Sequence, residues 1–196
     1  MKFLDNYFNR KIFSRYHVEY EEFPRINGRI MMRRDATGRI RIGKNVRINS
    51  GYEANPVGGL RTALMSMAEG IIEIGSHTGI SNTGIFARTS VTIGEYVYIG
   101  AGCNIYDSNF HSIYHTERIN RNSGVKTAPV RIGDRVFIGA HCIILKGVTI
   151  GADSVIAAGS VLVKSVPEKE IWGGNPARFI SKIPELIKED EVKNAN

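Results

Sequence analysis

The hydrophobic positions of this chain recur at intervals of six residues. In VRIGDRVFIGAHCIILKGVTIGADSVIAAGSVLVK, residues 130–164, an aliphatic residue returns at every sixth position. Helices repeat every 3.6 residues and strands every two, so this period requires a longer structural unit. The spacing also occurs earlier, with one extra residue near 88–89. The predicted interior residues are Ile42, Ile48, Ile74, Ile80, Phe86, Ile93, Ile99, Ile105, Ile132, Ile138, Ile144, Ile150, Ile156 and Leu162.

Two other hexad positions repeat as well. Glycine follows the aliphatic residue in many units, and a small or β-branched residue lies four positions after it. We interpret each hexad as one short strand and one tight turn, with three hexads completing a coil. The aliphatic residue then fills the interior, glycine relieves the turn, and successive coils pair as parallel strands. The glycines are Gly43, Gly75, Gly94, Gly100, Gly133, Gly139 and Gly151, and the small residues are Val97, Cys103, Val136, Cys142, Val148, Ser154 and Ser160.

This repeat, followed by WGGNPARFI at residues 172–180, resembles the hexapeptide-repeat acyltransferases. The resemblance is strongest to the galactoside, maltose and exopolysaccharide O-acetyltransferase branch. It implies an all-β fold, a left-handed parallel β-helix, whose handedness comes from the resemblance alone. We expect an N-terminal capping segment at 1–39, a catalytic β-helix at 40–180 with an extended loop at 106–129, and a C-terminal helix and tail at 181–196.

Two segments fall outside the repeat. FLDNYFNRKIF, residues 3–13, has the apolar spacing of an amphipathic helix. We expect it to cap the open end of the coil; the alternative is contact with an anionic membrane through its aromatic face and nearby arginines. Residues 51–70 are interpreted as a degenerate coil with a loop, or as a hinge.

The longest interruption, between Ile105 and Ile132, contains the candidate base. Acyl transfer to a hydroxyl requires a group that accepts the proton near neutral pH, and histidine suits this role. His111 stands where the resembled family has its catalytic histidine, and His115 is the alternative in the same loop. Asp107 is predicted to orient His111, to contact the acceptor, or to form an Asx turn at the loop entrance.

The resemblance also implies binding residues and an assembly. Acetyl-coenzyme A, as co-substrate, would lie along small residues at Gly139, Ala140 and Ala158. Its phosphates would contact Lys164 and Arg178. Asn82 matches a position that holds the acceptor sugar in relatives, but an acidic residue that galactoside-type enzymes have near 87–88 is absent here. A homotrimer with sites shared between subunits is expected.

Composition bears on the expected partners and cellular compartment of the protein. The net charge of +7 suits an anionic partner such as nucleic acid, an acidic membrane or a phosphorylated small molecule. We find no nucleic-acid-binding motif and expect no nucleic-acid partner. Two cysteines without a CxxC motif are typical of a reduced, cytoplasmic protein, and no apolar run predicts a secretory leader or a membrane span. Both cysteines occupy inward hexad positions, so an acyl-cysteine intermediate is not expected.

These observations predict an acetyl-coenzyme A-dependent O-acetyltransferase that acts on a sugar hydroxyl by direct transfer, in polysaccharide biosynthesis. One alternative is N-acetylation of an amino sugar, and another is acetylation of an antibiotic. From a different class, a metal protein of the γ-carbonic anhydrase type would need three converging histidines, for which His77, His111 and His141 are the candidates. We expect no metal.

Overall fold

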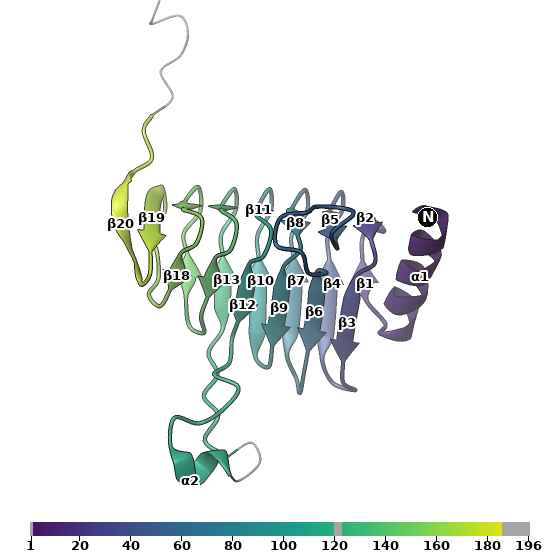
Figure 1. The fold of residues 1–196 in the computed structure, drawn as a ribbon, viewed down its shortest axis with the longest axis horizontal. Helices are drawn as coiled ribbons and strands as arrows, with labels where there is room; N and C mark the ends of the chain where they lie inside the picture. The colour runs from purple at the N-terminus through teal and green to yellow at the C-terminus, as the bar shows by residue number, and fades with distance from the viewer. Residues whose placement is uncertain (1, 120–122, 186–196) are drawn as a thin grey trace, which may run out of the picture.

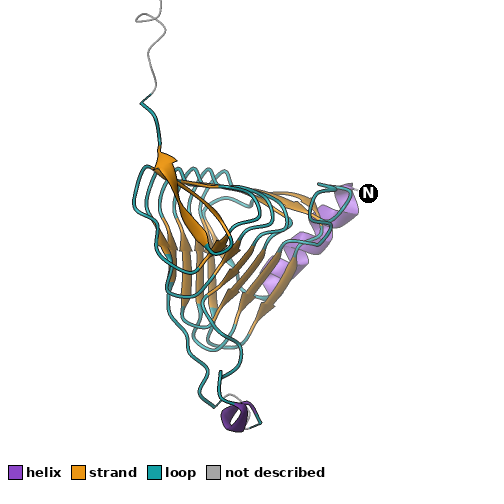
Figure 2. Ribbon diagram, turned by 60° about the vertical axis from the view of Figure 1, so that its left-hand side comes forward, coloured by secondary structure: helices purple, strands orange, loops and turns teal. Residues whose placement is uncertain are grey.

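The computed structural model describes residues 2–119 and 123–185, and its strands wind into a three-sided prism (Figures 1 and 2). Each coil contributes one strand to each of three parallel sheets, here called A, B and C. The predicted fold class, a left-handed parallel β-helix of hexapeptide repeats, is confirmed. The corners at which the chain passes between sheets are called A–B, B–C and C–A below.

From β1 to β18 the strands follow the order A, B, C along the chain, and β19 and β20 both join sheet B. Sheet A contains β1 (Glu19–Tyr20), β4 (Arg39–Ile42), β7 (Ile71–Ile74), β10 (Ser90–Ile93), β13 (Val130–Ile132) and β16 (Thr149–Ile150). Sheet B contains β2 (Arg25–Gly28), β5 (Arg47–Ser50), β8 (Gly79–Ser81), β11 (Tyr98–Ile99), β14 (Phe137–Ile138), β17 (Val155–Ile156), β19 (Glu170–Gly174) and β20 (Ala177–Lys182). Sheet C contains β3 (Met31–Arg34), β6 (Ala63–Ser66), β9 (Gly84–Ala87), β12 (Asn104–Tyr106), β15 (Ile143–Ile144) and β18 (Val161–Leu162).

The predicted interior residues form the core, with one exception. Thirteen of the fourteen are at most 3% exposed, and they stack in register from coil to coil, as in the pairing of Ile105 with Ile144. The exception is Phe86: Ile85 is the buried residue of β9 and pairs with Ile105, whereas Phe86 lies on the outer face. The B–C turn at Asn82–Thr83 is one residue short, and this shifts the register.

The role of the hexad glycines differs from the prediction. Positive φ, which the turn requires, falls two residues later, as at His77 (62°) and His141 (59°). A Cβ on Gly139 would lie 2.6 Å from the backbone nitrogen of Ala158 in the next coil, closer than real contacts allow. The glycines therefore permit the close approach of neighbouring coils, rather than the turn conformation itself.

The N-terminal boundary also differs from the prediction. The coil begins at Glu19, because β1, β2 and β3 pair in parallel with β4, β5 and β6. Only helix α1 (Lys2–Arg15) lies outside it, at the N-terminal end of the prism (Figure 1). The fully buried Asn9 joins α1 to the first coil: its amide donates to the carbonyl of Gly28 at 2.9 Å and accepts from the N–H of Ile30 at 3.2 Å.

Replacing Asn9 by alanine is expected to lower the free energy of unfolding by about 1–2 kcal/mol, because two backbone groups lose their buried partner. Asn6→Ala is the matched control, since Asn6 is exposed on the same helix. Urea denaturation of both variants measures the difference. Equal stability of the two variants would contradict this account of Asn9.

The C-terminal end closes differently from the prediction. Strand β19 continues sheet B, and β20 turns back antiparallel to it, so the β-structure ends at Lys182 and not at 180. The helix predicted from Pro184 lies almost wholly outside the described residues. In the predicted loop 106–129, a short helix, α2 (His115–Arg118), projects from the C–A corner (Figure 2). No helix among the described residues is long and apolar enough to cross a membrane.

Candidate active site

The loop that interrupts the coil leaves from the C–A corner and carries His111. The side chain of His111 is exposed, and its backbone N–H donates to the carbonyl of Asn109 at 2.7 Å. The base of the loop is held by a bridge between Ser108 and Thr127 and by the N–H of Ala128, which donates to the carbonyl of Asp107 at 2.9 Å. A histidine reachable from solvent therefore sits on a loop anchored to a rigid coil.

Asp107 anchors the backbone rather than the imidazole. Its side chain is completely buried, and its carboxylate accepts the N–H groups of Arg88, at 2.9 Å, and Thr89, at 2.6 Å. Burial raises the pKa of this carboxyl above its ordinary value, and the backbone donors oppose that shift. These contacts fix the backbone of residues 88–89 in the neighbouring coil against the start of the loop, so Asp107 positions the C–A corner.

Asn82 is committed to a second loop, at residues 51–62. Its amide nitrogen donates to the carbonyls of Asn55 (2.7 Å) and Val57 (2.9 Å), and its amide oxygen accepts the N–H of Gly51 at 2.8 Å. The side chain is 2% exposed. The segment predicted as a degenerate coil or hinge is thus a loop along the B–C corner followed by strand β6, with Asn82 as its anchor.

Between the two loops lies a cavity of about 740 Å³ on the outer face of sheet C. The loop at 51–62 borders it at the B–C corner, and Phe110 borders it at the C–A corner, one residue before His111. Its floor was not predicted from the sequence. The floor residues are Met65, Phe86 and Tyr106. The sequence signal that could have revealed them is an apolar residue directly after the interior residue of each of these sheet C strands.

The predicted donor residues divide between two corners. Gly139, Ala140 and Ala158 lie together at the B–C corner, in consecutive coils. Arg178 is exposed on β20, in the hairpin that follows this corner, and its guanidinium donates to the carbonyl of Ala177. Lys164 is exposed at the C–A corner, across sheet C from the other four. Within one copy, the expected donor corner and His111 therefore lie on different edges of the prism.

Both cysteines are buried in the core. Cys103 is 1% exposed and Cys142 is not exposed, and their thiols lie against the carbonyls of Gly139 and Ala157 at 3.1 Å and 3.2 Å. The interaction with the Cys142 thiol, and then burial, raise the pKa of the Cys103 thiol above its ordinary value, and the same interaction lowers the pKa of Cys142. Neither residue is placed to act as an exposed nucleophile.

We expect a water-soluble disulfide reagent to titrate no thiol in the folded protein and two in denaturant, because access requires opening of the coil. Absorbance of the released thiolate measures both numbers. Rapid reaction of one thiol under native conditions would contradict this burial.

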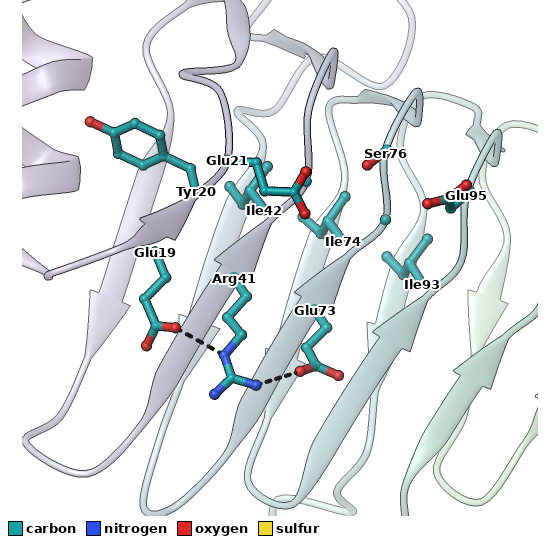
Figure 3. Close-up of a pocket in the computed structure, with 12 residues that line it drawn as sticks. Glu19, Tyr20, Glu21, Arg41, Ile42, Glu73, Ile74, Ser76, Ile93 and Glu95 are labelled. Atoms are coloured by element: carbon teal, nitrogen blue, oxygen red, sulfur yellow. Dashed lines mark hydrogen bonds and ion pairs between the residues drawn. The ribbon is translucent and has the colours of Figure 1, made fainter.

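A second cavity, of about 420 Å³, lies on sheet A (Figure 3). Arg41 is held there between Glu19, at 3.0 Å, and Glu73, at 2.9 Å. These carboxylates raise the pKa of the Arg41 guanidinium. Because both acids are already paired with one cation, they do not form a free acid–base couple, and none of the predicted site residues lines this cavity.

The three histidines that the metal-protein hypothesis requires do not converge within one copy. Across residues 2–119 and 123–185, no group of three histidine, cysteine or acidic side chains is arranged to hold a metal ion. His77 lies at the A–B corner, where its ring stacks on Tyr96 at 4.6 Å. His111 lies in the C–A loop and His141 at the B–C corner, so the three histidines occupy three different edges.

The known proteins that this chain is similar to include acyltransferases with the same kind of repeat. Residues 129–164 match the family described as the hexapeptide repeat of succinyl-transferase. The chain is 37% identical over 105 residues to the galactoside O-acetyltransferase of Escherichia coli, a match that spans 54% of this chain and 50% of that protein. The matched segment thus spans about half the length of that relative.

Solved structures extend the likeness to most of the chain. A hexapeptide-repeat acetyltransferase of Vibrio cholerae, solved with acetyl-coenzyme A, is 26% identical, with a TM-score of 0.59, and the match covers 90% of this chain and 77% of that one. AntD, an N-acyltransferase of Bacillus cereus solved with dTDP-4-amino-4,6-dideoxyglucose and coenzyme A, has a TM-score of 0.69 with 94% of both chains covered. At 22% identity, this second likeness shows the fold alone.

Proposed function

We propose that this chain, which is similar to hexapeptide-repeat acetyltransferases, transfers an acetyl group from acetyl-coenzyme A to a sugar hydroxyl. The observation that carries the proposal is the exposed His111 on a loop that leaves the coil at the C–A corner. Polysaccharide biosynthesis is the setting that we propose for this reaction.

His111 acts as the general base in this proposal. Its imidazole accepts the proton of the acceptor hydroxyl while the oxygen attacks the thioester carbonyl. The tetrahedral intermediate then breaks its carbon–sulfur bond, and the departing coenzyme A thiolate takes the proton from the imidazolium. Transfer is direct, in keeping with the burial of Cys103 and Cys142.

The donor is proposed to lie along the B–C corner. Gly139, Ala140 and Ala158 leave the backbone accessible to an extended pantetheine arm, and Lys164 and Arg178 are proposed to neutralise the phosphates. Because His111 and this corner lie on different edges of one copy, we propose a homotrimer in which neighbouring copies complete each site. Asn82 bounds the acceptor side through the loop that it anchors.

Acetylation of an amine is the second candidate, favoured by the fold-level likeness to the N-acyltransferase AntD. The two reactions differ in their pH dependence. An amino group must lose its own proton before it attacks, so N-acetylation follows the pKa of the acceptor amine. O-acetylation follows the titration of the enzyme base instead.

Release of the coenzyme A thiol, followed with a thiol-reactive dye, tests the proposal across hydroxyl and amino sugars. We expect turnover with a hydroxyl acceptor and a pH profile that does not change with the acceptor. Turnover restricted to amino sugars would replace the proposal with N-acetylation. Failure of the protein to bind coenzyme A, measured by calorimetry, would remove the transferase assignment.

A further inference from the structure

The outer faces of sheets A and C differ in chemistry. The outward positions of sheet A are mostly polar or charged, as at Arg39, Arg41, Glu73, Thr92, Arg131 and Thr149, and Ile71 is an apolar exception. Under the cavity on sheet C, they are mostly apolar instead, with Met31, Met65, Phe86 and Tyr106 contributed by four successive coils. Apolar residues that line a cavity at the protein surface commonly mark a binding site.

An aromatic cluster closes the cavity next to the histidine loop. The ring of Phe110 lies 4.6 Å from that of Phe86 and 5.1 Å from that of Tyr106, measured between centroids. Phe110 has φ of 62°, a conformation that is rare for a bulky residue. It is held by the hydroxyl of Ser108, which accepts its N–H at 3.1 Å. The backbone thus holds an aromatic ring over the cavity directly before His111.

Few polar groups in the cavity remain to bind sugar hydroxyls. No aspartate or glutamate lines it. The amide of Asn82 is already engaged by the loop at 51–62. The remaining polar side chains that line the cavity, apart from the Tyr106 hydroxyl, are those of Arg61, Asn104 and His141. A volume of about 740 Å³ falls in the ordinary range of small-molecule sites, which are apolar with a few orienting polar groups.

We propose that the acceptor carries an apolar group, an alkyl chain or aromatic aglycone, which occupies this cavity while the attached sugar lies toward the His111 loop. The inference rests on the proposed function and deepens it by naming the acceptor class as an amphipathic glycoside. The apolar floor binds the aglycone, and Phe110 separates this part of the acceptor from the reacting end.

Calorimetry without acetyl-coenzyme A tests the acceptor class independently of catalysis. Methyl and octyl glycosides of galactose, glucose and N-acetylglucosamine are compared below the concentration at which micelles form. We expect at least one octyl glycoside to bind at least about tenfold more tightly than its methyl partner, because methylenes leave water for the apolar floor. Octyl glycosides that bind no more tightly than their methyl partners, in all three pairs, would overturn the proposal.

Two variants locate the binding. Phe86→Ser and Met65→Gln are expected to remove most of the octyl preference, whereas Phe137→Ser, at an exposed outward position of sheet B, keeps it. Circular dichroism checks that each variant is folded. An unchanged preference in both cavity variants would overturn the proposal. So would loss of oligomers in these two variants by sedimentation, because the floor would then be a contact between copies.

A separate observation concerns the N-terminal end of the prism. Residues 1–47 contain 12 of the 26 basic and 5 of the 19 acidic residues, so this segment carries the whole net charge of +7. On α1, Phe3 is 85% exposed, and Leu4, Tyr7 and Phe8 are 40–55% exposed. Basic residues beside exposed aromatic and aliphatic side chains are typical of helices that bind the surface of anionic membranes.

We infer that α1 docks this end of the prism on an anionic lipid surface. Co-sedimentation with phosphatidylglycerol-containing vesicles, compared with pure phosphatidylcholine, is expected to show several-fold stronger binding to the anionic vesicles. The double variant Phe3→Ser, Leu4→Ser should reduce this binding several-fold, whereas Tyr98→Ser on sheet B should not. Equal binding to both vesicle types, or an unchanged double variant, would overturn the inference. Binding to duplex DNA that matches vesicle binding would replace the membrane with nucleic acid.

Discussion

Turnover of the His111→Ala variant is expected to fall by roughly 10²–10⁴-fold, the usual contribution of a positioned general base. The exposed imidazole lies on a loop whose ends are fixed to the coil, so its removal should leave the fold intact. Steady-state release of coenzyme A thiol gives the rate, and calorimetry gives the affinity for coenzyme A. We expect the affinity to be unchanged, because His111 is proposed to take a proton from the acceptor hydroxyl, whereas coenzyme A is proposed to bind through the small residues of the B–C corner, Lys164 and Arg178.

His115→Ala is the matched comparison, since His115 is also exposed and lies in the same loop, within α2. Its turnover is expected to stay within about twofold of the parent, a difference below that of a base. If His115→Ala loses activity while His111→Ala keeps it, the base is His115. Full activity in both single variants and in the double variant would exclude the loop as the source of the base.

The Asp107→Ala variant is expected to lose roughly 3 kcal/mol of stability, because the backbone N–H groups of Arg88 and Thr89 lose a charged acceptor whose side chain is fully buried. A loss of this size is a large part of the stability of a typical domain. Turnover should fall as well, since the His111 loop rests on this corner. Chemical denaturation measures the first effect and thiol release measures the second.

Asp134→Ala is a sharp control, because this carboxylate also accepts a backbone N–H, from Glu95 at 2.8 Å, but is exposed. Its stability should change by less than about 1 kcal/mol. Asp107→Asn should lose less than Asp107→Ala, since it keeps an acceptor and removes a buried charge. If Asp134→Ala lost as much stability as Asp107→Ala, the larger effect that we assign to the buried carboxylate would be contradicted.

The raised pKa of Asp107 also sets a direction for the pH dependence. A folded pKa above the unfolded value means that the folded state binds this proton more tightly. The resulting stabilisation is present below the unfolded pKa and is lost as the pH rises through the folded pKa. Denaturation of the parent between acid and neutral pH should show this step, and Asp107→Asn should lack it.

The repeating interior could be predicted from the sequence because a period of six leaves little freedom for the buried residue. The prediction was wrong at Phe86, where the B–C turn is one residue shorter and Ile85 becomes the interior residue. Counting hexads cannot detect a shortened turn compensated by a longer one at 88–89. The first coil was missed for a related reason, since no glycine in it directly follows an aliphatic residue, as one does in many later hexads.

Predictions for individual site residues depended on contacts that spacing does not encode. Residue type alone was enough to select His111, Asp107 and Asn82 as candidates. The hydrogen-bond partners of Asp107 and Asn82, however, are backbone groups far away in sequence. The apolar floor of the sheet C cavity needs side chains from three successive coils, and these residues align only once the assignment of strands to the three sheets is known. Individually, Met65 and Tyr106 resemble any other strand residue.

Helix α1 has a consequence for whether molecules associate end to end at high protein concentration. A parallel coil ends in unpaired strand edges, and each edge is a template on which the first or last coil of another molecule could add. Asn9 and the rest of α1 cover the N-terminal end, and β20 covers sheet B at the other. In the language of polymer growth, these two elements are chain terminators: they keep a fold that could extend without limit at the length of one molecule.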